Sequence, residues 1–165
     1  MRMRTLAGLA GLLLIGCGTQ APPATHREAA ESTHSHERDK MKLADLGKNH
    51  HVGLTAHLSS KTGNELDIFI EAADDAHTPT PLPVMKLLAK AVAADGKVHD
   101  LVFEPAEMEE RKDDPPGKCS HFVAKAPWMK PSDTLTIMAD IPIDGQSHPV
   151  EWKDFNPKKY AHFDE

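Results

Sequence analysis

The sequence predicts an all-β domain built from short antiparallel strands. Two observations carry this prediction: apolar residues alternate with polar ones in several runs, and Asp-Gly dipeptides separate neighbouring runs. Leu66, Ile68 and Ile70 form one such alternation, which is typical of a strand with one buried face. Asp95-Gly96 and Asp144-Gly145 accept the positive φ angles of tight turns between antiparallel strands.

About seven strands are expected between residues 52 and 152. The first two form a hairpin across a turn-rich loop, and two further hairpins flank the Asp-Gly turns. The expected strands are 52–58, 65–71, 87–93, 98–103, 119–125, 135–141 and 147–152. Short strands at nearly regular spacing over about a hundred residues predict closure as an antiparallel, immunoglobulin-like β-sandwich.

The segment 83–94 fits a helix as well as a strand, because most of its residues are apolar. Prolines at 79, 81 and 83 and the Asp-Gly turn after the segment favour the strand. Residues 107–118 are rich in charge, proline and glycine and predict a solvated loop whose charges need no function.

Residues 1–16 have the layout of a signal peptide. Arg2 and Arg4 precede an apolar run from Leu6 to Ile15, which is too short to cross a hydrocarbon core that needs roughly twenty residues. Gly16-Cys17 closes the run and resembles a lipobox, where a diacylglyceryl group is attached to the cysteine sulfur before cleavage. We therefore expect cleavage before Cys17, acylation of its thiol and anchoring to a bacterial membrane. The glycine after the cysteine favours the outer membrane, with the protein facing the periplasm.

Residues 17–48 are expected to form a lipidated, flexible polar tether, because up to about Lys40 they offer almost nothing large and apolar to bury. A short helix over 37–46, ended by Gly47, is predicted at its end. Loss of residues 1–16 removes two arginines and no acid, so the net charge falls from −6 to −8. Such an acidic chain is repelled by nucleic acid and by anionic headgroups, so neither is expected as a partner.

The β-sandwich domain is expected to span residues 49–153, followed by a C-terminal tail, 154–165, that is rich in aromatic residues and histidine. In one interpretation Phe155, Tyr160 and Phe163 fold back to cover one end of the sandwich. In the other interpretation the tail docks a partner protein.

The stretch Pro115 to Phe122, preceded by hairpins and followed by a threonine-rich strand, an Asp-Gly turn and a closing strand, resembles small periplasmic β-sandwich lipoproteins of planctomycete-like bacteria. The similarity spans residues 54–152. Similar modules occur alone as lipoproteins or beside heavy-metal efflux adaptors. The resemblance therefore implies a β-sandwich with an efflux or envelope protein as a possible partner. The chain has His-His-Val-Gly at 50–53, where those proteins have a histidine followed by paired glycines.

Histidine is the residue type that could carry chemistry, because the chain has 11 and imidazole is a common ligand of copper and zinc. With Cys17 acylated, Cys119 has no disulfide partner. Cys119 and His121 lie two apart on an expected strand, so their side chains leave the same face and could share a metal such as Cu(I). The alternative is that both merely line the sheet. Further candidate ligands are His50, His51, His148, His34 and His36.

No hydrolase, nucleotide-binding or zinc-protease motif is found in the sequence, so we expect a protein that is not an enzyme. Two classes of function stay open. The first is a membrane-anchored, non-catalytic binding module with loose handling of Cu or Zn. The second is a structural or protein-interaction β-sandwich with no metal role, which holds its partner by an edge strand or by the tail.

Overall fold

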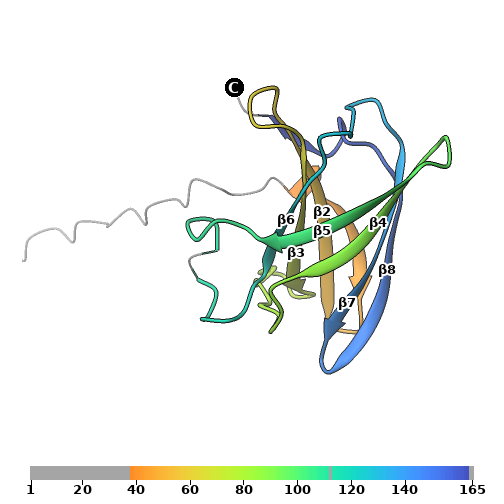
Figure 1. Ribbon diagram of the computed structural model, residues 1–165. Helices are drawn as coiled ribbons and strands as arrows, with labels where there is room; N and C mark the ends of the chain where they lie inside the picture. The colour runs from red at the N-terminus through yellow and green to blue at the C-terminus, as the bar shows by residue number, and fades with distance from the viewer. Residues whose placement is uncertain (1–37, 112, 164–165) are drawn as a thin grey trace, which may run out of the picture. The chain divides into compact units, whose positions relative to one another are not determined.

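The computed structural model describes residues 38–111 and 113–163, and the fold below refers to this part of the chain. It contains one turn of 3-10 helix and nine strands that curve around a common interior (Figure 1). The helix η1 spans Arg38–Lys40, and the strands are β1 (Lys42–Leu46), β2 (His50–Leu58), β3 (Glu65–Ala72), β4 (Leu87–Ala93), β5 (Val98–Pro105), β6 (His121–Lys125), β7 (Leu135–Ile143), β8 (Gln146–Phe155) and β9 (Ala161–Phe163).

The strands form one antiparallel sheet in the order β1-β2-β3-β6-β5-β4-β7-β8, to which β9 adds a short parallel pairing with β2. The connection between β5 and β6 is narrow, with Glu104 opposite Val123 and Pro105 opposite Phe122. At the two ends of this order, the Lys42 ammonium of β1 donates a hydrogen bond to the Asp154 carbonyl of β8 at 3.4 Å. The sheet is therefore nearly closed and resembles a barrel.

The predicted all-β antiparallel architecture is confirmed, and a strand is present at each of the seven expected places. The segment that also fitted a helix contains β4, which pairs with β5 on one side and β7 on the other. The Asp144-Gly145 turn has the expected positive φ at both residues, 52° and 75°, whereas in Asp95-Gly96 the glycine alone has it, at 83°.

The predicted helix over 37–46 is wrong. Residues 38–40 form a single 3-10 turn, and the following residues form β1, which pairs along the edge of β2. Gly47 has a φ of 64° and ends β1 at a tight turn into β2 rather than ending a helix. Leu46 is fully buried, so pairing with β2 both satisfies the backbone and removes this side chain from water. The folded domain thus begins inside the segment expected to be tether, and residues 17–37 lie outside the described part.

The tail interpretation in which aromatic residues fold back is confirmed for Phe155 and Tyr160. Phe155 is the last residue of β8 and is fully buried, and its ring stacks on Tyr160 with centroids 5.4 Å apart. The Ala56 amide donates to the Tyr160 carbonyl at 2.9 Å, just before β9 pairs with the same edge of β2. The tail is therefore part of the sheet.

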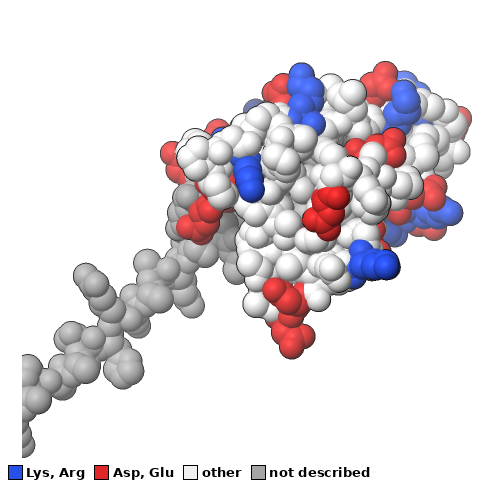
Figure 2. Space-filling view, turned by 90° about the horizontal axis from the view of Figure 1, so that it is seen from below, with Lys and Arg blue, Asp and Glu red and all other residues white. Residues whose placement is uncertain are grey.

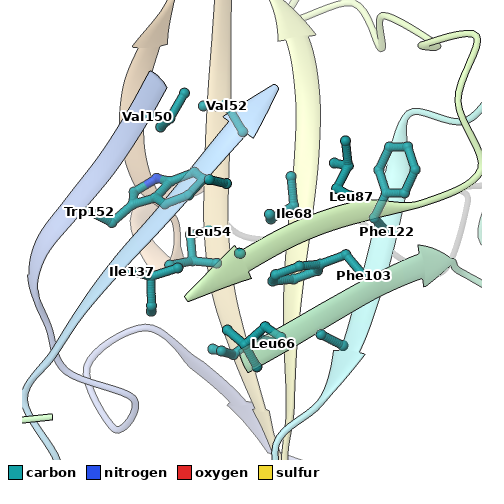
Figure 3. Packing of buried hydrophobic residues seen from close by; sticks show 14 of the residues in the cluster. Val52, Leu54, Leu66, Ile68, Leu87, Phe103, Phe122, Ile137, Val150 and Trp152 are labelled. Atoms are coloured by element: carbon teal, nitrogen blue, oxygen red, sulfur yellow. The ribbon is translucent and has the colours of Figure 1, made fainter. Parts of the chain in front are cut away.

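Alternate side chains of the strands fill one continuous core. Trp152, Phe103 and Phe122 are among its largest members, and each is at most 1% exposed. Figure 3 shows these rings pointing into the same interior, with aliphatic side chains such as Leu54 and Ile68 between them. Burial of a side chain of this size contributes ~1.5–3 kcal/mol.

Candidate binding face

The outer face of the four strands β5, β4, β7 and β8 carries exposed apolar side chains. Strand β4 shows why: Leu87 and Ala89 point into the core, and the alternation leaves Leu88 and Lys90 on the outside. Leu88 is 65% exposed, and its register partner on β5, Val102, is 44% exposed. Exposed apolar residues that adjoin one another on a sheet indicate an interaction surface more strongly than isolated ones do.

A groove of about 820 Å³ runs over this face. Leu88, Val102, Met138 and Pro149 contribute apolar side chains to its walls, one from each of the four strands. Met138 is 39% exposed and lies opposite Lys90 in the pairing of β4 with β7. Each of the four strands therefore contributes an apolar side chain to the groove.

Charged side chains are placed among these apolar ones. The Lys90 ammonium donates to an Asp100 carboxylate oxygen at 2.6 Å across β4 and β5. This hydrogen bond, together with the positive charge of the ammonium, lowers the pKa of the Asp100 carboxyl. Asp140 and Glu151 add exposed carboxylates on β7 and β8. The groove therefore offers apolar contacts and both signs of charge.

The structure does not bring Cys119 and His121 together as a ligand pair. Cys119 is fully buried in the core, and its thiol donates a hydrogen bond to the His121 carbonyl oxygen at 2.9 Å. Burial raises the pKa of the Cys119 thiol, which disfavours the thiolate that a metal requires. The same-face expectation fails because Cys119 precedes the regular part of β6 and makes only an isolated bridge to Leu82.

The imidazole of His121 lies instead against the outer side of β3. Its ring stacks on Phe69 with centroids 4.1 Å apart, and Nε2 is 3.0 Å from an Asp67 carboxylate oxygen. Nδ1, on the other side of the ring, is 3.5 Å from Glu110. Because each ring nitrogen faces a different carboxylate, the arrangement holds the loop that contains Glu110 against the sheet.

The remaining histidines that were candidate ligands are distributed over separate neighbours. His51 Nδ1 is 3.4 Å from Asp45 of β1, and His50 Nδ1 is 4.0 Å from Asp144 in the turn between β7 and β8. The His148 ring lies over Gly47, where an added Cβ would be 3.5 Å from its Cε1.

Within the described residues, no group of three or more His, Cys, Asp or Glu side chains has an arrangement that could hold a metal ion. His34, His36 and Cys17 lie outside the described part.

On the end of the domain shown in Figure 2, acidic and basic side chains are interspersed among uncharged residues.

The sequence reasoning did not single out Leu88, Val102 and Met138 as site residues. Leu88 and Val102 sit beside buried apolar neighbours in their strands, so the alternation of apolar and polar residues is interrupted there. That interruption was a usable signal: an apolar residue at an outward position of a one-face-buried strand indicates a surface that contacts something.

In comparisons with known proteins, no family model, no curated protein and no solved structure matches the chain. Among the described residues, no helix has the length and apolar composition needed to span a bilayer.

Proposed function

We propose that the chain is a membrane-anchored extracytoplasmic lipoprotein whose β-domain acts as a non-catalytic module that binds another protein. The observation that carries the binding role is the apolar groove across β5, β4, β7 and β8, where Leu88, Val102 and Met138 are exposed together. Exposed apolar side chains that adjoin one another in this way are typical of surfaces that contact another protein.

Anchoring is supported by the N-terminal sequence. Arg2, Arg4, the apolar run Leu6 to Ile15 and Gly16-Cys17 form a lipoprotein signal, and acylation of Cys17 would hold the mature chain on a bacterial membrane, with the outer membrane as the proposed site. An envelope protein is the corresponding class of partner.

We also propose that the domain belongs to the immunoglobulin-like class of β-sandwiches. Lettering β2 to β8 as A to G in chain order turns the observed strand order into A-B-E-D followed by C-F-G. Those are the two sheets of the constant-type immunoglobulin fold. The narrow connection lies between β6 and β5, which are E and D, whereas β5 pairs with β4 along most of its length. We therefore place strand D beside C, so that the two halves are A-B-E and D-C-F-G, with β1 and β9 as additions at the outer edge of β2.

Copper or zinc handling is the alternative role, and the described residues favour protein binding over it. Cys119 is in the core, and His50, His51, His121 and His148 each have a different neighbour. Metal handling would therefore depend chiefly on His34 and His36 of the tether.

Anchoring can be tested with Cys17→Ala. Because acylation needs the thiol of this residue, we expect the variant to accumulate as an uncleaved precursor without incorporated fatty acid. Metabolic labelling with a fatty acid and the mass of the mature chain provide the measurement, with Cys119→Ala as the matched control that keeps Cys17. Equal labelling of the Cys17→Ala variant and the wild type would contradict the anchor.

Binding through the groove can be tested by placing a photo-crosslinking amino acid at single positions of the chain in its native envelope. We expect a discrete covalent adduct with the label at Leu88 or Met138. The control is Lys61, an exposed residue in the loop between β2 and β3. No adduct at the groove, or equal adducts at all three positions, would overturn the binding role of this face.

A further inference from the structure

We infer that the protein bound by the outer face of β5, β4, β7 and β8 is a second copy of this chain. The inference rests on the binding role proposed above and names the partner. It is drawn from the pattern of charge and apolar side chains on the face itself.

Four outward side chains at the centre of the face form a two-by-two grid on β4 and β7. Lys90 lies opposite Met138, and the neighbouring pair Ala89 and Ala139 places Leu88 beside Asp140. One diagonal of this grid is therefore apolar, from Leu88 to Met138. The other diagonal has a cation at one end and an anion at the other, Lys90 and Asp140.

This pattern is complementary to itself under a two-fold rotation. Suppose that two copies face each other and that the two-fold axis lies between them, parallel to the apolar diagonal. Leu88 then meets Leu88 of the other copy, and Met138 meets Met138. Lys90, which donates to Asp100 of its own chain, then also faces Asp140 of the other copy, and this contact occurs twice. An isologous dimer requires such reciprocal contacts.

The geometry fits a known mode of sheet packing. Strands lie about 4.8 Å apart and outward side chains about 6.8 Å apart along a strand, so the diagonal is about 35° from the strand direction. Rotation about it makes the strands of the two copies cross at about 70°, which is close to the orthogonal class of sheet packing.

The size of the face predicts a weak dimer. Four strands with up to four outward side chains each cover a square about 20 Å on a side. Two such faces bury roughly 800–1,000 Å² in total, at the lower end of specific interfaces, so we expect dissociation constants in the micromolar range or above.

Charge reversal tests the inference, because the two contacts are reciprocal. We expect Lys90→Asp to weaken dimerisation by at least about tenfold, since it would place two pairs of like charges in contact. Asp140→Lys should do the same, and the double variant should recover most of the loss. Leu88→Glu should remain monomeric, and Lys61→Asp, a charge change remote from the face, should leave association unchanged.

The measurement is sedimentation equilibrium over a wide concentration range, using residues 18–165. This chain contains every residue that the structure describes, and their buried side chains form one core. We expect a weight-average mass that rises towards twice the monomer mass.

A wild-type chain that stays monomeric throughout, or a dimer indifferent to Leu88→Glu and to charge reversal, would overturn the inference. Photo-crosslinking at Leu88 distinguishes this failure from failure of the binding role. An adduct with a different protein refutes the dimer and keeps the binding face, whereas no adduct refutes both.

Discussion

Cys119 fits a metal-ligand pattern in the sequence, but its side chain is part of the hydrophobic core. Its side chain is fully buried, its thiol bonds to a backbone carbonyl, and burial raises its pKa. All three features favour the neutral thiol, whereas metal ligation and nucleophilic reactivity need the thiolate.

Replacement of Cys119 by serine should therefore lower stability and leave metal affinity unchanged. A hydroxyl fills less space than a thiol, and its shorter bond to Cβ places it farther from the His121 carbonyl, so we expect a weaker hydrogen bond and a loss of ~1–3 kcal/mol in the free energy of unfolding. Urea denaturation and a Cu(I) competition titration on the same sample provide the two measurements. Strongly weakened Cu(I) binding with unchanged stability would show that the thiol is a ligand after all.

A comparison of Asp67 and Glu110 explains which contact of His121 holds more firmly. Asp67 is 13% exposed and 3.0 Å from the ring nitrogen, whereas Glu110 is 39% exposed and 3.5 Å away. Solvent screens the second contact more strongly than the first. The sequence could not show either contact. Asp67 lies far before His121 along the chain, and Glu110 lies on the loop that precedes His121.

Whole strands were predictable where the alternation was long and the turn chemistry was clear, as in β3 and around Gly96 and Gly145. Strands β1 and β9 were missed, because they are short and exist only by pairing with the edge of β2. Such pairing depends on residues distant in sequence, which local periodicity does not record. The adjacent apolar residues at 87–88 and 101–103 signal an apolar outer face, but the sequence does not say which residue of each group points outward.

The integration of β1 into the sheet leads to a prediction about the domain boundary. Removal of residues before 49 deletes β1 and uncovers the core around Leu46, which is fully buried. We expect a chain that starts at residue 49 to be less stable than one that starts at residue 38 by at least ~2–5 kcal/mol, the usual cost of losing one large buried side chain. Thermal unfolding of the two chains measures the difference, and Leu46→Ala in the longer chain tests whether this side chain accounts for most of it. Equal melting temperatures would place β1 outside the cooperative unit.

On the scale of the whole molecule, the two halves of the sheet pack around a single hydrophobic core. The single cluster of buried residues includes Leu54 and Ile68 from β2 and β3 together with Ile137 and Trp152 from β7 and β8. Figure 3 shows the same mixture around the common interior. Neither half can open without exposing apolar surface of the other.

The shared core predicts two-state unfolding, and the two tryptophans allow a direct test. Trp152 is buried in the core, whereas Trp128 is half-buried and stacks on His99 with centroids 3.7 Å apart. In Trp128→Phe the fluorescence of Trp152 alone reports the core, and in Trp152→Phe the fluorescence of Trp128 reports the periphery. We expect each fluorescence transition to coincide with loss of the far-ultraviolet β signal of the same variant. Two separated transitions in Trp128→Phe would mean that the halves unfold independently.

The variant Trp152→Ala tests how much the shared core contributes to stability. Deletion of this indole should lower the free energy of unfolding by ~3–5 kcal/mol. The transitions reported by Trp128 fluorescence and by the far-ultraviolet signal should both move to lower temperature by the same amount.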